Sequence, residues 1–75
     1  MQTHSHETFR TLPDLGTLWT SERHGLMMIT RIEDYATTGF GEVIYTFHVY
    51  RVKDSFNTTG IFTTRDWYAT FTHVA

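Results

Sequence analysis

With 75 residues, a net charge of −2 and no cysteine, the chain is a small, slightly acidic protein. This length allows one domain, with little room for a core and a deep catalytic pocket together. The lack of cysteine excludes a disulfide framework and thiolate zinc sites. Because no apolar run approaches the roughly 18 residues that span a membrane, and the polar N-terminus has no signal-peptide pattern, we expect a cytoplasmic protein.

Aromatic residues make up 16% of the chain and threonine is plentiful. Both residue types favour strands, because flat and β-branched side chains pack well on a pleated surface. The residues that favour helices, such as alanine, leucine, glutamate and lysine, are sparse. The composition therefore predicts an all-β fold.

The start of the chain reads as a flexible tail, residues 1–13, in front of one domain, residues 14–75. The tail has too few apolar groups to offset the entropy lost on ordering. Within it, only Phe9 and Leu12 are expected to touch the core. Residues 13–16, Pro-Asp-Leu-Gly, predict a turn, because proline presets φ and glycine accepts positive φ.

The clearest strand covers residues 43–52, where side chains alternate between two fairly apolar faces. Polar segment 33–41 is expected to be a loop or a frayed hairpin tip, and segment 53–60 a turn. Phe40 is an apolar residue near the tip of the first of these. The other strands are expected over residues 17–20, 26–32, 61–64 and 72–74.

One segment breaks the strand alternation. Trp67 and Phe71 are spaced i and i+4, which is typical of a helical turn. Asp66 falls in the first residues of this turn, where a negative charge suits the helix dipole. We expect a short helix or 3₁₀ turn that places both rings in the interior and points Tyr68 outward.

This order of elements is similar to SH3-like barrels, in which a short 3₁₀ turn lies between the last two strands. Phe62, Trp67, Phe71 and Val74 at their spacing, with Gly16-x-x-Trp19 near the start, look like small SH3-like proteins of tailed phages and prophages, many without an assigned function. The resemblance covers roughly residues 15–74. It implies a five-stranded SH3-like barrel that binds macromolecules. The chain lacks the Ala-x-Tyr-x-Tyr motif of peptide-binding SH3 domains, so proline-rich peptides are not expected ligands.

The sequence offers no positive support for an enzyme. His24, His48 and His73 are candidate acid/base groups, but their spacing does not show that they converge. Neither a Gly-x-Ser-x-Gly elbow nor a glycine-rich phosphate loop is present. His4 and His6 could face one ion, but no fixed third ligand is identifiable, so we expect neither a metal nor another cofactor.

Protein binding is our leading functional hypothesis, with a phage accessory protein engaging a host or phage protein as the specific form. Aromatic side chains with a polar tip are enriched at interfaces. Acidic residues near the expected hairpin tip, including Glu42, could also imitate phosphate and occupy a basic groove. The expected partner-binding residues are Tyr50, Phe56, Tyr68, Phe40, Glu33 and Asp34.

Three alternatives remain open. A nucleic-acid-binding barrel would use Arg31, Arg51, Lys53 and Arg65, although basic residues are scattered and the net charge is negative. A minor enzyme would use His48 or His73. A structural subunit would oligomerise through an exposed strand edge.

Overall fold

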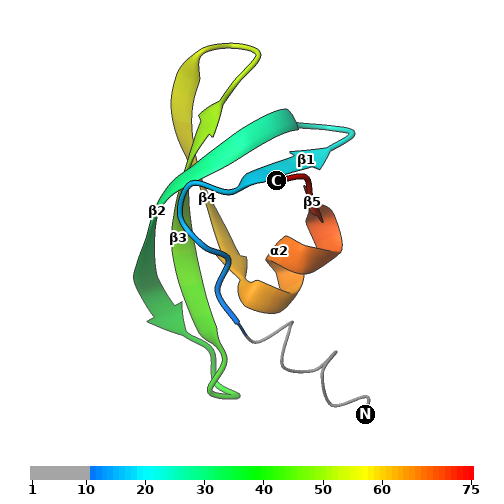
Figure 1. Ribbon diagram of the computed structural model, residues 1–75. Helices are drawn as coiled ribbons and strands as arrows, with labels where there is room; N and C mark the ends of the chain where they lie inside the picture. Colours follow the sequence, from blue (N-terminus) through cyan, green and yellow to red (C-terminus); the bar gives the residue numbers. More distant parts are fainter. Residues whose placement is uncertain (1–10) are drawn as a thin grey trace.

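A computed structural model describes residues 11–75 as one five-stranded antiparallel sheet and one short helix (Figure 1). The strand order is β4-β3-β2-β1-β5. The mostly β fold confirms the expectation from composition, and the short helix near the C-terminus confirms the expectation from the spacing of Trp67 and Phe71. The candidate metal residues His4 and His6, the contact of Phe9 and the tail before residue 11 lie outside the described residues. The elements are β1 (Leu18–Ser21), β2 (Gly25–Thr37), β3 (Val43–Arg51), β4 (Phe56–Thr63), α2 (Thr64–Thr70) and β5 (Thr72–His73).

The second strand is longer than expected. β2 continues to Thr37, through most of the segment 33–41 that we expected to be a loop. It pairs with β3 over this length, and Thr37 lies opposite Val43. The expected loop was wrong over residues 33–37, because polar residues are compatible with a strand whose outer face is exposed to solvent. The hairpin tip itself lies within residues 38–42.

A β-bulge at Thr30 interrupts the alternation of inward and outward side chains along β2. The register passes from Ile29 opposite Val49 to Arg31 opposite His48, so Thr30 is an extra residue. Its hydroxyl donates to the carbonyl of His48 at 3.1 Å. Because one inserted residue exchanges the faces, Arg31 now lies on the outer face of the sheet.

The fourth strand also starts earlier than expected. β4 begins at Phe56, so most of segment 53–60, predicted as a turn, belongs to the strand. The turn itself covers residues 52–55, with Ser55 at a positive φ of 54°. Pairing with β3 extends this threonine-rich segment, because strand preference depends on neighbours more than on local turn chemistry.

The helix forms where the i, i+4 spacing predicted it. The hydroxyl of Thr63 caps α2 by accepting from the amide of Asp66 at 3.0 Å, and Asp66 occupies the first turn. Trp67 is fully buried and Phe71 is 5% exposed. The chain leaves the helix at Phe71, whose amide donates to the carbonyl of Trp67 at 2.9 Å.

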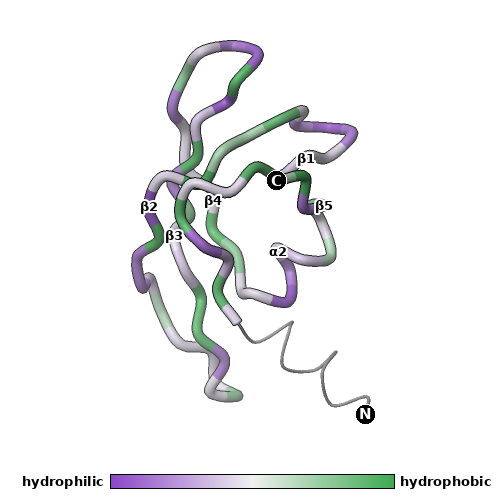
Figure 2. The backbone as a smooth tube through the Cα atoms, in the orientation of Figure 1, coloured by the Kyte–Doolittle hydropathy of each residue, from purple (hydrophilic) through white to green (hydrophobic). Residues whose placement is uncertain are grey.

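The core lies on the concave side of the bent sheet, where α2 packs (Figure 1). The ring of Trp67 stacks on Phe47, with centroids 4.4 Å apart and planes 4° apart. Hydrophilic residues concentrate in turns such as the one between β1 and β2 (Figure 2). The buried apolar residues are Trp19, Met27, Ile29, Phe47, Val49, Trp67 and Phe71.

Tyr68 does not point outward as expected. It is half-buried, its ring lies 5.5 Å from Trp19, and its hydroxyl donates to the carbonyl of Thr11 at 3.1 Å. Burial raises the pKa of the Tyr68 hydroxyl above 10.0, and the charge of Asp14 adds to this. The segment before β1 approaches this side of α2, so Tyr68 lies between two elements rather than at a free surface.

The two outermost strands of the sheet are β4 and β5. Within residues 11–75, no backbone pairing joins them, and they are connected through α2. Within these residues, the sheet is therefore open between β4 and β5.

Replacing Phe71 with alanine is expected to lower the free energy of unfolding by about 3–5 kcal/mol, because the change deletes a buried ring. Tyr68→Ala is expected to cost less, roughly 1–2 kcal/mol, since this side chain is half-buried. The exposed Ala69 on the same helix provides a control, with Ala69→Ser changing stability by under about 0.5 kcal/mol. Urea melts measure all three, and a larger loss for Tyr68→Ala than for Phe71→Ala contradicts the packing described here.

Candidate functional site

The direction of the backbone groups in β3 determines which groups β4 presents outward. The amide of Val52 donates to the carbonyl of Leu26 at 3.1 Å, so Val52 faces β2. Backbone groups alternate in direction along a strand. The backbone N–H and C=O of Arg51 therefore point toward β4, where Arg51 lies opposite Phe56.

The same alternation places the N–H and C=O groups of Asn57, Thr59 and Ile61 on the free side of β4. Among residues 11–75, no strand lies on that side. Asn57 and Thr59 are exposed and Ile61 is 51% exposed. Such a row of unpaired backbone groups is a template for another extended chain.

A pocket of about 180 Å³ adjoins this edge on the concave side. Its lining comes from β2, β3 and β4, and from α2, Phe71 just after it and the β1–β2 turn across the open side. A cavity of about 150 Å³ is enough for benzene, so this pocket has room for one side chain. The residues that line it include Phe47, Val49, Arg51, Thr58, Gly60, Trp67 and Phe71.

Gly60 lies beside Phe62 at the pocket. A Cβ atom at Gly60 would lie 2.7 Å from the ring of Phe62, which is too close. The missing side chain therefore lets the Phe62 ring fold over the strand, an arrangement that shields a strand glycine. Phe62 in turn packs edge-on against Trp67 at 5.4 Å.

Two buried nitrogen atoms of pocket residues, Arg51 Nε and Trp67 Nε1, have no hydrogen-bond partner within residues 11–75. The indole of Trp19, by contrast, donates to the hydroxyl of Thr17 at 2.8 Å. A buried donor without an acceptor costs about 1–3 kcal/mol.

Arg51 connects the pocket to one predicted partner-binding residue. Its guanidinium lies 5.9 Å from the ring centroid of Phe56, and its Nη2 is 3.1 Å from Asp54. Phe56 is 50% exposed at the start of β4. The sequence pointed to Phe56 because it is aromatic, assigned Arg51 to a phosphate contact, and did not indicate Thr58, Thr59 or Gly60 as site residues.

The other predicted partner-binding residues do not gather at this pocket. Phe40 is 99% exposed at the β2–β3 hairpin end, and Figure 1 shows this end far from the β3–β4 turn. Tyr50 is half-buried opposite Asn57, on the outer face. Glu33 and Asp34 lie within β2, and Tyr68 lies on α2.

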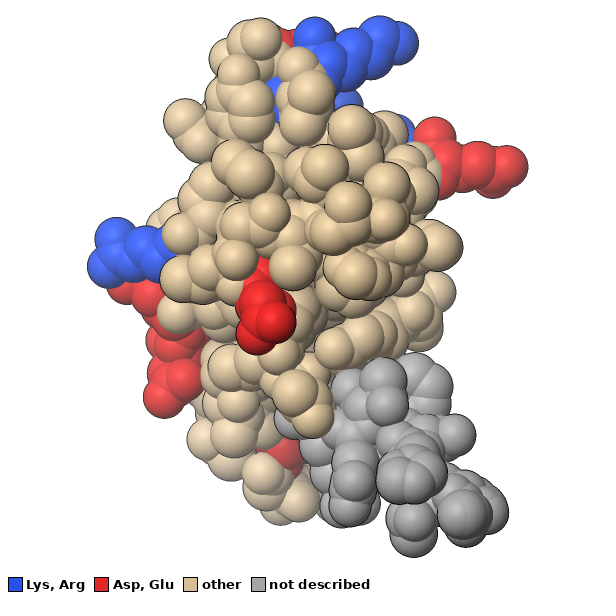
Figure 3. Space-filling model, in the orientation of Figure 1, with Lys and Arg blue, Asp and Glu red and all other residues tan. Residues whose placement is uncertain are grey.

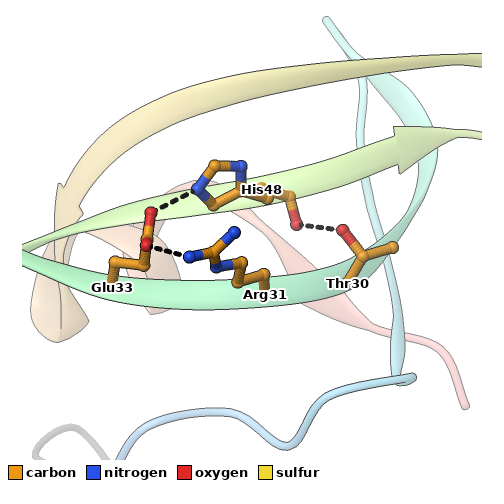
Figure 4. Close-up of polar contacts among 4 residues, drawn as sticks. All are labelled: Thr30, Arg31, Glu33 and His48. Atoms are coloured by element: carbon orange, nitrogen blue, oxygen red, sulfur yellow. Dashed lines mark hydrogen bonds and ion pairs between the residues drawn. The ribbon is translucent and has the colours of Figure 1, made fainter.

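A charged group lies on the outer face, beyond the bulge (Figure 4). The carboxylate of Glu33 binds Arg31 and also accepts from His48, whose Nε2 is 2.8 Å away. The hydrogen bond from His48 lowers the pKa of Glu33 below the ordinary 4.5, and the charge of Arg31 lowers it further. This arrangement depends on the bulge at Thr30, which turns Arg31 and Glu33 outward.

The predicted nucleic-acid residues do not form a free basic surface. Arg31 pairs with Glu33, Arg51 with Asp54, and Arg65 with Glu42 at 3.2 Å. In Figure 3, Lys and Arg lie at the margins of the visible face, and the group on the left lies beside acidic side chains. The fourth residue, Lys53, lies in the β3–β4 turn. In the acidic group that could imitate phosphate, Glu33 and Glu42 are the partners in two of these ion pairs.

The three candidate acid/base histidines have different surroundings. Nδ1 of His24 lies 3.0 Å from the hydroxyl of Ser21, and the ring of His73 lies 4.9 Å from Trp19. His48 contacts Glu33 on the outer face. Across residues 11–75, no group of three or more His, Cys, Asp or Glu side chains is placed to hold a metal ion.

No protein family, curated protein or solved structure matches this chain. In the part of the chain that the structure describes, no helix has the length and apolar character needed to cross a membrane.

The pKa of Glu33 offers a direct check of the outer-face group. In the folded state it is lowered, so this carboxylate stabilises the fold above its ordinary pKa of 4.5, and the contribution is lost as pH falls through the lower folded value. Carboxyl NMR titration should give a pKa below 4.5 for Glu33. His48→Gln should raise it, whereas His73→Gln should leave it unchanged; an equal effect of both would contradict the assignment.

Proposed function

We propose that the chain is a non-enzymatic protein-binding module built on an SH3-like barrel, acting in the cytoplasm on a phage or host protein. The observation that carries this proposal is the free edge of β4 beside a pocket. A partner segment in extended conformation adds to this edge as a sixth strand. Its backbone pairs with Asn57, Thr59 and Ile61, and its side chains reach the pocket.

Strand addition is a general mode of peptide recognition. Main-chain hydrogen bonds supply affinity, and pockets for alternate side chains supply specificity. The β4 edge has both features, and the exposed ring of Phe56 adds apolar contact area at its start. The opposite edge, β5, has only two residues and offers much less backbone.

The SH3-like part of the proposal is supported by the order of elements. A short helix lies between the last two strands, as the resemblance implies, and its capped first turn directly follows β4. In this arrangement α2 covers the concave side between β4 and β5. The open side of the barrel then coincides with the binding edge.

Blocking the outward amide of Thr59 tests the proposal. Thr59→Pro removes this donor and adds bulk at the free side, while the pairing with β3 is retained because the Thr59 amide does not face β3. We expect peptides selected on the wild-type chain from a random twelve-residue display library to bind this variant at least about tenfold more weakly. Isothermal titration calorimetry measures the affinities.

The matched control is Thr59→Val, which keeps the amide and nearly the same side-chain volume; it should change affinity by less than about threefold. Thermal melts establish that both variants remain folded. A library that yields no binder, or binders that are indifferent to Thr59→Pro, would overturn the proposal. Concentration-dependent sedimentation that Thr59→Pro abolishes would instead assign the edge to a second copy of the chain.

A further inference from the structure

We infer that the end of the β2–β3 hairpin, residues 35–42, is a second contact surface, on which Phe40 is a pre-positioned anchor that enters an apolar pocket of a partner protein. Figure 1 shows this hairpin end extending past α2 at the bottom of the view. The surface uses no backbone group of the β4 edge. The inference therefore stands or falls independently of strand addition at β4.

The two most exposed aromatic rings of residues 11–75 both belong to the hairpin end. Phe40 is 99% exposed, and Tyr35, at the second bulge of β2, is 61% exposed. Single apolar side chains on a surface are common and usually need no explanation. Phe40 is a different case, because a ring with almost no buried area at the tip of a hairpin contributes little to the fold.

Hydrogen bonds fix the backbone that carries this ring. The hydroxyl of Thr38 accepts from the amides of Phe40 at 3.2 Å and Glu42 at 3.1 Å. The carbonyl of Thr38 accepts from the amide of Gly41 at 3.0 Å, and its amide donates to the carbonyl of Glu42 at 2.8 Å. Gly41 has a φ of 85°, which glycine adopts without strain. The tip therefore presents Phe40 from a fixed position, which lowers the entropy lost when a partner binds the ring.

The charges around the hairpin end indicate the kind of partner. Arg31 pairs with Glu33, and Arg65 pairs with Glu42, so both cations are engaged within the chain. Asp34 is a third carboxylate, so three anions stand against two cations. An anionic membrane attracts unpaired Lys and Arg side chains, and the hairpin end has none beyond these two pairs. A protein pocket with an apolar interior and a basic rim matches both the ring and the charge.

A soluble molecule with an apolar cavity tests this chemistry on the full chain. β-Cyclodextrin encloses a single aromatic ring, and its rim is available with amino groups or with carboxylates. We expect the amino form to bind at Phe40, detected in NMR titrations as shifts of the Phe40 ring and backbone signals. Phe40→Ala should abolish this binding and leave the melting temperature unchanged, because the ring is 99% exposed.

Two references separate a fixed anchor from an ordinary exposed ring. The first is a free peptide of residues 38–42, acetylated and amidated, which carries the same ring without the hairpin. The chain should bind the amino form at least about fivefold more tightly than this peptide does. The second is Thr38→Val, which removes the accepting hydroxyl at nearly the same volume and should remove most of that advantage.

The matched control is Phe56→Ser, which removes a 50% exposed ring beside the cationic Arg51. This variant should bind the amino form as the wild-type chain does. At low ionic strength, where exposed charges are least screened, the carboxylate form should bind at least about threefold more weakly than the amino form. Thr59→Pro, which blocks the β4 edge, should leave all of these affinities unchanged.

Equal affinity of the chain and the free peptide overturns the inference, and so does binding that survives Phe40→Ala. A preference for the carboxylate form overturns the basic rim of the expected pocket. Vesicles of phosphatidylcholine with about one third phosphatidylglycerol test the other class of partner. Sedimentation of the chain with these vesicles that Phe40→Ala abolishes would assign the anchor to a membrane surface instead of a protein.

Discussion

The insertion of Trp67 into the concave face of the sheet is the interaction on which the rest of the structure depends. Its ring is fully buried, stacks on Phe47 at 4.4 Å and contacts Phe71 at 4.1 Å. A seven-residue helix is too short to be stable alone in water, so α2 forms because this ring is buried. Since α2 connects β4 to β5, the positions of both sheet edges follow from the same contact.

The contact that stabilises the helix also explains the unused donor. The ring of Trp67 stacks on Phe47 and meets Phe62 edge-on, and its Nε1 is buried without an acceptor in residues 11–75. The indole of Trp19 donates to the hydroxyl of Thr17 instead. The core is therefore incomplete in hydrogen bonding at one buried nitrogen of a residue that lines the pocket.

Local patterns in the sequence predicted the parts of the fold that depend on local contacts. The alternation over 43–52 and the spacing of Trp67 and Phe71 each specify an element without reference to the rest of the chain. The end of β2 and the start of β4 do not, because both are polar segments that become extended by pairing with β3. The bulge at Thr30 adds a residue to β2, so the two-residue alternation of inward and outward side chains is interrupted there.

The candidate site was less predictable, because it depends on strand order rather than on residue type. The aromatic residue type pointed to Phe56, but nothing local shows that β4 is an edge strand or that Gly60 lies beside a pocket. Arg51 resembled a phosphate contact as long as only charge was considered. The structure instead pairs it with Asp54 and places it in the lining of a small pocket. Strand order is thus what brings a scattered arginine and a core tryptophan into the lining of one pocket.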